Sequence, residues 1–490
     1  MKRKVWIIGL VALLLPGCGK EVPEEYRQLD EETRAQRKYV NTFAWNVMDT
    51  YYLWRDEIAP ALEAWKTWEE PVQKVKDIRY KDADGKDIDR WTLLTDDFEA
   101  LQGGVSGHTR TFGMDFLLYY ASDAHDRIVA VVTYTYADSP ADKAGLRRGD
   151  VVLTVDGREM TPVNYQQLLR ETLLGGGTVK LGLPEGKAVS LTAVDMYENP
   201  VQTVRILERP DGRKVGYLHY TSFTLDSCEE LSRVFRNFRN EGIADLVLDL
   251  RYNGGGYVQT EMVLASMLAP VSAVSAGQVF FQEVFNAKMS EYREDEPTRF
   301  QTGFTFQSNG VPQVVSTAGS NPDLRRLYVL VTRDSASASE SLIGGLCPYM
   351  DVIVIGEQTG GKYCAGYLME APDWYDAVRK SLGEDEYAKA LPYVDNWGIY
   401  VMYARYADCN GVTLSMPDGI APDVGAEDRP RDGFGLGDPE ETMLSVALAL
   451  MEGRPVPAGT RSAPAPALTP VSDAPRRPGT GLLVGAAPLR

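Results

Sequence analysis

Histidine is scarce in this sequence: the 490 residues include only His108, His125 and His219. A serine nucleophile usually takes its base from a histidine, so this scarcity limits how a hydroxyl could be activated. All three histidines lie in the first half of the chain, and His219 alternates with apolar residues in GYLHYTSF. That alternation is typical of a strand histidine satisfied in the core. We therefore look for a catalytic base among other residue types.

Positive charge is also in deficit. Lysine and arginine total 51 against 69 aspartates and glutamates, which gives a formal net charge of -18. No basic stripe that would track a phosphate backbone is evident, so we expect no nucleic-acid partner. The length predicts about three domains with sizeable cores.

The start of the chain has a short apolar run but not one long enough to span a membrane. Val5 to Leu15 falls short of the roughly 20 residues that a spanning helix needs, and Lys2, Arg3 and Lys4 precede it. The pattern predicts a signal peptide over residues 1–17. LPGC resembles the bacterial lipobox, which predicts lipidation of Cys18 and an exported protein anchored to a bacterial membrane, on the periplasmic side or at the cell surface. The alternative is simple cleavage without a lipid.

Only four cysteines follow Cys18, at positions 228, 347, 364 and 409. An oxidising compartment permits disulfides. Cys364 and Cys409 lie in two strand-like runs, KYCAGYLME and IYVMYARYADC. Antiparallel pairing of these runs would bring the two cysteines together, so a disulfide between Cys364 and Cys409 is one hypothesis. The alternative is that all four cysteines are unpaired, buried thiols.

The pattern along the chain predicts an α+β or α/β multidomain protein. Apolar and aromatic residues at helical spacing predict a small helical domain at 37–105 after a charged tether at 18–36. Short alternating strands with one helix predict a β-rich module at 110–199. Alternating strands and helices predict an α/β core at 200–453, with a helical insertion at 371–397 and a segment at 272–325 that lacks clear periodicity and could line a substrate groove. The Pro/Ala-rich residues 454–490 are expected to be disordered.

Within the β-rich module, SPADKAGLRRGDVVLTVDG closely resembles the core of PDZ domains. The resemblance implies that a peptide C-terminus binds backbone N–H groups of the loop before the second strand and adds to the sheet as a strand. The matching positions are Phe112, Gly113 and Met114, with Asp115 and Phe116 continuing the strand. A PDZ module without a ligand, acting as a rigid spacer, is the alternative.

Four serines alternate in TRDSASASES, directly after the apolar run 327–331. A strand followed by a helix start leaves N–H groups free at the positive end of the helix dipole. Ser337 lies three residues before Glu340, which predicts a capping box. The same geometry suits acyl transfer, since the Ala338 N–H would face a developing oxyanion. Both interpretations fit this segment.

Two further segments complete a candidate site. DLRYNGGG follows a buried strand, and Gly254 or Gly255 could supply a second oxyanion donor, although a tight turn is the simpler interpretation. A dinucleotide-binding turn is excluded because Gln259 occupies the place of the third glycine. Lys362, in TGGKYC, is the best candidate base, provided that burial or a neighbouring positive charge keeps it neutral.

Together, SASASE, VIGEQTGGK, LVLDLRYNGGG, the inserted PDZ domain and GIAPDV resemble the carboxy-terminal processing proteases, S41-type serine peptidases with a Ser/Lys dyad. The resemblance covers roughly residues 40–450 and implies a ClpP/crotonase-like core. It makes Ser337 the nucleophile and Lys362, 25 residues later, the base. Many members place a glutamine four residues after the lysine to orient it, but Gly366 stands there, so the third group is unassigned.

The sequence therefore predicts a serine endopeptidase that recognises exposed C-termini of exported proteins through a PDZ domain. No metal or cofactor is implied. The alternative is a non-catalytic lipoprotein that binds peptides or apolar ligands on the same scaffold, which the missing glutamine favours and the Ser337–Lys362 spacing opposes.

Overall fold

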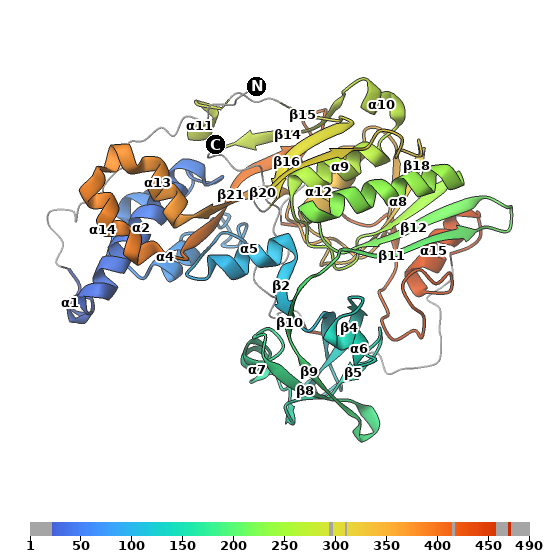
Figure 1. The fold of residues 1–490 in the computed structure, drawn as a ribbon, viewed down its shortest axis with the longest axis horizontal. Coiled ribbons are helices and arrows are strands. Elements are labelled where there is room, and N and C mark those ends of the chain that lie inside the picture. Colours follow the sequence, from blue (N-terminus) through green and yellow to red (C-terminus); the bar gives the residue numbers. More distant parts are fainter. Residues whose placement is uncertain (1–21, 294–296, 309–310, 414–416, 457–468, 472–490) are drawn as a thin grey trace.

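The computed structural model describes residues 22–293, 297–308, 311–413, 417–456 and 469–471. The predicted signal peptide and Cys18 lie outside these ranges. Within them, no helix is both long and apolar enough to cross a membrane. Figure 1 shows one large body and a smaller lobe below it, formed by β2 to β10.

The N-terminal residues form a helical layer on the large body. Its elements are α1 (Glu24–Gln28), α2 (Glu31–Tyr51), α3 (Ala59–Ala64), α4 (Pro71–Asp77), β1 (Leu93–Thr95) and α5 (Phe98–Ser106). Helix α2 begins inside the predicted tether because Asp30 caps it, accepting from the Thr33 N–H at 2.7 Å. The predicted boundary at residue 37 is therefore too late.

This layer is not an independent domain. Strand β1 pairs with β21 (Gly398–Ala407), a strand of a five-stranded sheet in the large body, and α2 packs on α13 (Ala371–Leu382) and α14 (Glu384–Val394). Tyr39 of α2 stacks on Tyr393 of α14 with ring centroids 5.8 Å apart. One continuous buried core joins all these elements. The predicted N-terminal domain and the predicted helical insertion are thus one structural unit (Figure 1, left).

The lobe below has its own apolar core. Its strands are β2 (His108–Thr111), β3 (Met114–Tyr120), β4 (Ile128–Thr135), β5 (Val151–Val152), β6 (Thr154–Val155), β7 (Arg158–Glu159), β8 (Thr178–Gly182), β9 (Ala188–Thr192) and β10 (Val194–Tyr197), with helices α6 (Pro140–Lys143) and α7 (Tyr165–Glu171). Strands β2 and β10 pair with each other where the chain enters and leaves the lobe. The lobe is rich in strands and extends from His108 at the start of β2 to Tyr197 at the end of β10, where a β-rich module is predicted for 110–199.

The centre of the large body is a six-stranded sheet in the order β11-β12-β13-β18-β19-β22. Its strands are β11 (Val201–Glu208), β12 (Lys214–Tyr220), β13 (Asp245–Asp249), β18 (Arg326–Val331), β19 (Asp351–Gly356) and β22 (Val424–Gly425). From β12 onward they run parallel. Alternate residues of these strands face two cores. Helices α8 (Cys228–Glu241), α9 (Val258–Leu268) and α12 (Ala338–Leu346) cover one face, and α15 (Thr442–Met451) covers the other.

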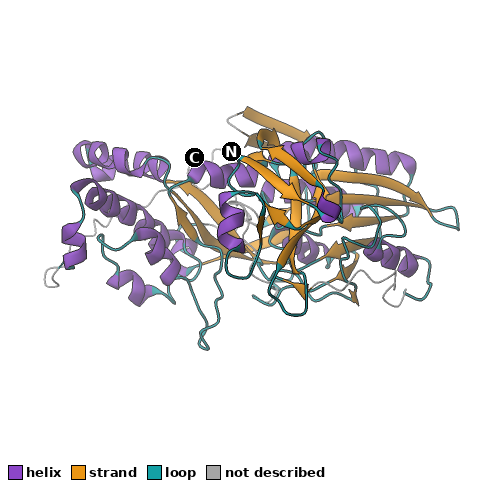
Figure 2. Cartoon of the chain, turned by 90° about the horizontal axis from the view of Figure 1, so that it is seen from below, coloured by secondary structure: helices purple, strands orange, loops and turns teal. Residues whose placement is uncertain are grey.

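A second sheet lies beside the first. Strands β14 (Val279–Phe285), β15 (Thr298–Arg299) and β20 (Cys364–Glu370) join β1 and β21. Strands β16 (Gly303–Ser308) and β17 (Val311–Ser316) form a hairpin, and α10 (Val271–Ser275) and α11 (Ala287–Ser290) are short helices. The segment 272–325 therefore holds more strand structure than its sequence pattern suggested. Seen from below, the helical layer lies at one end of the molecule and the strand-rich part at the other (Figure 2).

Two smaller expectations need correction. Residues 469–471 of the predicted disordered tail are ordered, because β23 (Thr469–Pro470) pairs with β3. Cys364 and Cys409 are both free, as are the two other cysteines in the described part of the chain. The two strand runs do pair, but Cys364 lies opposite Arg405. Cys409 lies in the turn beyond the end of β21, which keeps it out of reach of that register.

Candidate active site

The alternating serines have different partners. Ser335 Oγ donates to the Leu250 carbonyl at 2.8 Å, and Ser339 Oγ donates to the Asn253 carbonyl at 2.9 Å. Both bonds tie the start of α12 to the loop after β13. Ser337, between them, has no hydrogen-bond partner for its buried hydroxyl within the described part of the chain. Ser341 Oγ, further along α12, likewise has no hydrogen-bond partner among the described residues. Ser337 and Ser341 thus differ from the two serines that bond to the loop after β13.

Ser337 also has an unusual backbone. Its φ of 66° and ψ of -115° lie in the left-handed half of conformational space, which costs a non-glycine residue of order 1–3 kcal/mol. The Ser337 N–H donates to Glu340 Oε2 at 2.9 Å. The reciprocal contact at Ser337 Oγ has the capping-box arrangement but falls short of a hydrogen bond. Glu340 therefore holds the strained backbone and leaves the hydroxyl uncommitted.

The glycine loop lies directly against Ser337. A Cβ on Gly255, whose φ is 118°, would lie 2.8 Å from Ser337 Cβ and 3.2 Å from its Oγ. Only glycine tolerates both that φ and that contact. The Gly255 N–H donates to Asn253 Oδ1 at 2.9 Å, so it is not available as an oxyanion donor in this structure. No hydrogen bond among the described residues uses the N–H of Gly254 or of Ala338.

Lys362 is fully buried in the loop between β19 and β20. Burial lowers its pKa to about 7, against smaller opposing effects of Cys364, Asp89 and Glu340. Its Nζ lies 5.7 Å from the ring centroid of Trp91 and 4.9 Å from that of Tyr400. Near neutral pH a substantial fraction of this amine is therefore uncharged, as a general base requires.

Glu340 connects the two candidate residues. Its Oε2 accepts from the Ser337 N–H at 2.9 Å and from the Lys362 N–H at 2.7 Å. Its Oε1 accepts from the Gly361 N–H at 2.8 Å and from the Thr359 hydroxyl. Four donors on one buried carboxylate fix the serine turn against the lysine loop. In this structure the Ser337 hydroxyl and the Lys362 amine do not hydrogen bond to each other.

The position expected to hold an orienting glutamine is sterically closed. Gly366 lies opposite Met402 in the β20–β21 ladder, next to a bulge. A Cβ there would meet the ring of Tyr400, at 2.3 Å from Cζ and 2.5 Å from Cε2. The hydroxyl of this tyrosine lies 3.0 Å from Lys362 Nζ, which donates to it. No local sequence signal points to Tyr400, since its place depends on the register of a strand 38 residues beyond Lys362.

The three histidines take no part in this arrangement of Ser337, Lys362 and Glu340. His108 pairs with Asp226 at 2.8 Å, and His125 stacks on Tyr120. His219 is a buried strand residue, but it is not satisfied as predicted, because neither ring nitrogen has a partner among the described residues. Burial lowers its pKa to about 4, so the ring is neutral.

The smaller lobe contacts the glycine loop. Arg148, in the turn directly before β5, donates to the Tyr252 hydroxyl at 2.8 Å and to Asp428 at 2.7 Å. Tyr252 begins the turn that carries the three glycines, and its hydroxyl donates to the same Asp428. Arg251 completes this buried cluster with a bond to Asp428 at 2.9 Å. The lobe is therefore tied by buried charge to the loop that faces Ser337.

The residues predicted to bind a peptide lie at the start of β3 and in the loop before it. Gly113 precedes β3 with a φ of 73°, and its carbonyl accepts from the Tyr136 N–H at 2.9 Å. Phe112 and Met114 are buried in the core of the lobe, and Phe116 is half-buried on β3. The structure brings them together at one end of the β3 edge.

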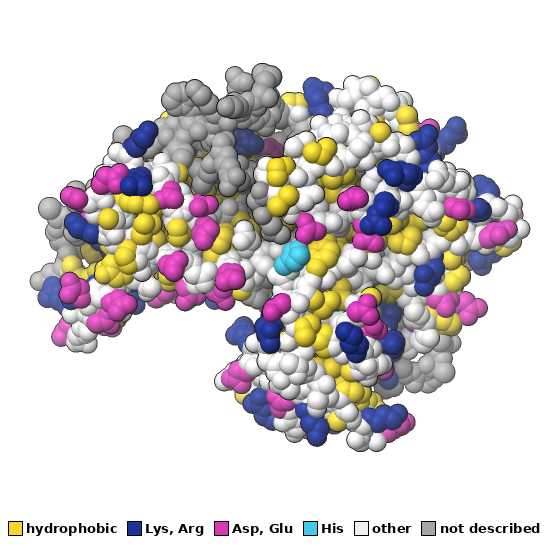
Figure 3. All heavy atoms as spheres, in the orientation of Figure 1, with side chains coloured by type: hydrophobic (Ala, Val, Ile, Leu, Met, Phe, Trp, Pro, Cys, Tyr) yellow, Lys and Arg dark blue, Asp and Glu magenta, His cyan; other side chains and the backbone are white. Residues whose placement is uncertain are grey.

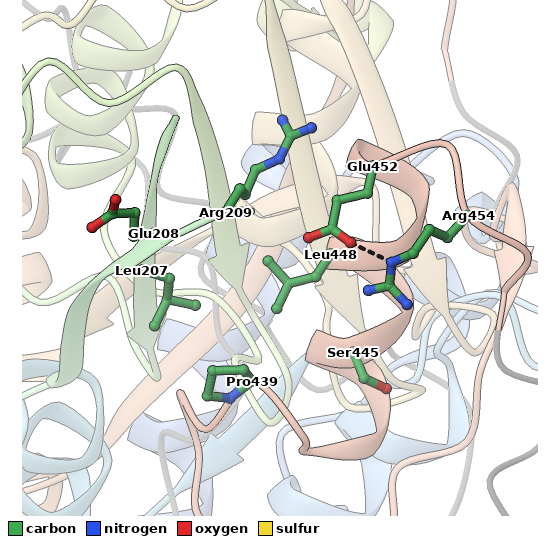
Figure 4. Close-up of a pocket in the computed structure, with 8 residues that line it drawn as sticks. All are labelled: Leu207, Glu208, Arg209, Pro439, Ser445, Leu448, Glu452 and Arg454. Carbon is green, nitrogen blue, oxygen red and sulfur yellow. Dashed lines mark hydrogen bonds and ion pairs between the residues drawn. The ribbon is translucent and has the colours of Figure 1, made fainter. Parts of the chain in front are cut away.

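A pocket elsewhere on the molecule does not involve this site. It lies between β11 and α15, where Leu207, Arg209, Leu448 and Arg454 contribute to its lining (Figure 4). On the face drawn in Figure 3, acidic and basic side chains are interspersed over both the body and the lobe. The described residues include no cluster of His, Cys, Asp or Glu that could hold a metal ion.

An α/β core with a serine turn, a glycine loop and a buried lysine, preceded by a lobe of PDZ type, defines a class of serine peptidase folds. Comparison with known families agrees: residues 214–426 match the model of peptidase family S41, and residues 131–173 match that of a PDZ domain. The chain therefore carries an S41 peptidase region and a PDZ domain, and the predicted resemblance is confirmed.

Curated relatives and solved structures extend this result. The chain is 27% identical to the chloroplastic C-terminal processing peptidase of Tetradesmus obliquus, over 66% of this chain and 62% of that protein. It is 23% identical to a carboxyl-terminal-processing protease of Picosynechococcus, over 57% and 61%. It thus spans about three fifths of these relatives. A solved structure from Bacteroides fragilis, described as an S41 protease, shares the fold, with a TM-score of 0.61, 23% identity and coverage of 84% and 97%.

Proposed function

We propose that this protein is a serine endopeptidase that cleaves protein chains with a Ser337–Lys362 dyad. The observation that carries the proposal is the Glu340 carboxylate, which holds the backbone of the serine turn and that of a buried lysine at one oxygen. A lysine with a pKa near 7 can accept a proton from a hydroxyl at neutral pH.

In the proposed reaction Ser337 Oγ attacks the scissile carbonyl carbon while its proton passes to Lys362 Nζ. The ammonium then returns that proton to the leaving amine nitrogen as the C–N bond breaks. Water deacylates the enzyme by the same proton path in reverse. The N–H groups of Ala338 and Gly254 stabilise the oxyanion, since that of Gly255 is already bound to Asn253. Substrate entry must align the two side chains, as catalytic hydrogen bonds often tighten only in the complex.

The PDZ domain supplies the proposed recognition of substrate. An extended C-terminus would add to the edge of β3, with its carboxylate at the N–H groups of the loop over Phe112 to Met114. The Arg148 contacts link this lobe to the glycine loop. The two relatives are named as a processing peptidase and a processing protease, which favours a peptidase over the non-catalytic binding protein.

The test is degradation of an unstructured substrate with an apolar C-terminus. Wild type should cleave it, and Ser337→Ala and Lys362→Ala should not. Lys389→Ala, which removes a largely exposed lysine of α14, is the matched control and should cleave like wild type. If wild type cleaves no faster than Ser337→Ala over a range of pH, the proposed activity is wrong.

Export and anchoring are a separate proposal, supported by the basic start, the short apolar run and LPGC. Cys18 would carry the lipid after removal of residues 1–17. Metabolic labelling with radioactive palmitate should mark the wild-type chain and not Cys18→Ala. Equal labelling of the two chains, or none of wild type, contradicts lipidation at this position.

A further inference from the structure

The absence of a side chain at Gly366 leaves room for the ring of Tyr400. Any side chain at position 366 would begin 2.3 Å from the Tyr400 ring, well inside the closest approach of two carbon atoms. The ring is fully buried and lies on the same face of the sheet as Met402. It cannot swing away without opening the packed β20–β21 ladder. The Tyr400 ring therefore fills the space that a side chain at position 366 would need.

The tyrosine hydroxyl has the chemistry that a base-orienting group needs. A neutral amine carries one lone pair and two N–H groups, and the lone pair must face the serine for proton transfer. An acceptor that takes one N–H restricts the rotation of the amine. Tyr400 Oη accepts from Lys362 Nζ at 3.0 Å, and the strand that carries it is paired with β1, β14 and β20.

We propose that Tyr400 is the positioning residue for Lys362 and takes the place of a side chain at 366. This inference rests on the proposed peptidase activity. Tyr400 keeps its own proton throughout: the serine proton goes to Lys362 Nζ and from there to the leaving amine. Its part is to hold the amine by one N–H and to supply an oxygen partner to the ammonium that forms in the dry site.

The first test is Tyr400→Phe, which removes one oxygen and keeps the ring. We expect kcat to fall about 10- to 100-fold with little change in KM, because the amine loses its alignment. The acid limb of the pH–rate profile should move to lower pH, because the ammonium loses an acceptor. Tyr403→Phe is the matched control: it removes a buried hydroxyl of the same strand that bonds to Glu283 and should keep both kcat and the profile.

The second test exchanges the two groups. Gly366→Gln alone should abolish activity, because its side chain clashes with the ring. Tyr400→Ala alone should also be inactive. The double variant Gly366→Gln/Tyr400→Ala has room for the amide and should recover at least tenfold over either single variant. Recovery of this kind is not expected if Tyr400 only fills space, so its failure counts against the inference.

The outcomes separate the two proposals. Loss of cleavage in Ser337→Ala together with wild-type kcat and pH profile in Tyr400→Phe overturns the role of Tyr400 and leaves the peptidase intact. Absence of any Ser337-dependent cleavage overturns both. The pH dependence of unfolding gives a readout free of activity: Tyr400→Phe should lower the pH at which Lys362 titrates, and an unchanged titration contradicts the proposed contact.

A second inference comes from the C-terminal segment. In the sheet β23-β3-β4-β5, β3 would be the edge strand without β23. Thr469 lies opposite Tyr120, and the Val471 N–H donates to the Leu118 carbonyl at 2.9 Å. Val471 is buried in the apolar core of the PDZ lobe. The segment is antiparallel to β3 and its C-terminal end points toward Met114. A peptide that binds a PDZ domain by adding a strand has the same direction.

We infer that residues 469–471 occupy the β3 edge as an internal ligand, so that the tail competes with peptides for the PDZ domain. The test is hydrogen exchange on the full chain. The Thr469 and Val471 amides should be protected, and Val471→Asp should remove this protection and expose β3. Val163→Asp, at a valine that is 96% exposed in the same lobe, is the control. Exchange of 469–471 at the rate of an unstructured peptide overturns the inference.

Discussion

The backbone N–H groups of Ser337 and Lys362 donate to the same oxygen, Oε2 of Glu340. The two nitrogens can therefore be no further apart than the sum of the two bonds, 2.9 and 2.7 Å. Replacing a carboxylate with four donors should lower the free energy of unfolding, because each lost bond leaves a buried N–H or O–H unsatisfied. Glu340 is thus the structural link between the proposed nucleophile and the proposed base.

Glu340→Gln should disrupt this link while keeping the size of the side chain. The amide nitrogen would face N–H donors, and we expect a loss of about 3 kcal/mol in the free energy of unfolding together with loss of cleavage. Denaturant titration measures the first and substrate degradation the second. Glu63→Gln, on exposed α3, should change neither. A Glu340→Gln variant as stable as wild type would show that the carboxylate does not hold the two loops.

Ser337→Ala should abolish cleavage and raise stability. An N-cap serine replaced by alanine ordinarily loses about 1 kcal/mol. Here the hydroxyl is buried without a partner among the described residues, so its removal relieves a desolvation cost and should gain about 1 kcal/mol. Denaturant unfolding at neutral pH measures the difference. A loss of stability would mean that the hydroxyl acts as an ordinary cap.

Lys362 should give stability a characteristic pH dependence. Its folded pKa of about 7 lies below the unfolded value of 10.5, so the unfolded chain binds more protons between these limits. The free energy of unfolding should therefore rise with pH from about 7 to 10, by up to about 1.4 kcal/mol per pH unit. Lys362→Met should lack this rise and be more stable than wild type near pH 7. Parallel curves for the two chains would contradict a depressed pKa.

The rate of cleavage should depend on the same titration. The base must be neutral, so kcat/KM should increase with pH through an apparent pKa near 7. Trp91→Ala should admit water to the lysine and shift this limb to higher pH, since hydration favours the ammonium. Trp68→Ala, at a half-buried tryptophan elsewhere in the N-terminal layer, is the control and should leave the limb in place. An acid limb that Trp91→Ala does not move would contradict the proposed base.

Gly255→Ala should block the site by contact alone. The new methyl group would meet Ser337 Cβ at 2.8 Å and would hold alanine at a φ of 118°. We expect loss of cleavage and about 2 kcal/mol or more of destabilisation. Gly303→Ala adds a methyl group where nothing lies within 4 Å and should do neither. Normal activity of Gly255→Ala would show that the glycine loop is not part of the site.

Much of this arrangement could be predicted from short-range sequence patterns. The serine turn, the glycine loop and the lysine loop each follow a buried parallel strand, and the ends of such strands meet at one edge of a sheet. Tyr400 could not be predicted in this way. Its contact with Lys362 depends on an antiparallel register and a bulge between Ala365 and Gly366, which no local pattern encodes. The unity of the N-terminal helices with α13 and α14 likewise depends on tertiary packing.

Covalent labelling tests the central claim most directly. Wild type, Lys362→Met and Ser337→Ala would each be incubated at pH 8 with a fluorophosphonate that reacts with activated serines, and the modified peptide would be identified by mass spectrometry. We predict one adduct, on Ser337 in wild type, with labelling slowed at least 100-fold in Lys362→Met and absent in Ser337→Ala. Equal labelling of wild type and Lys362→Met, or an adduct on another serine, would contradict it.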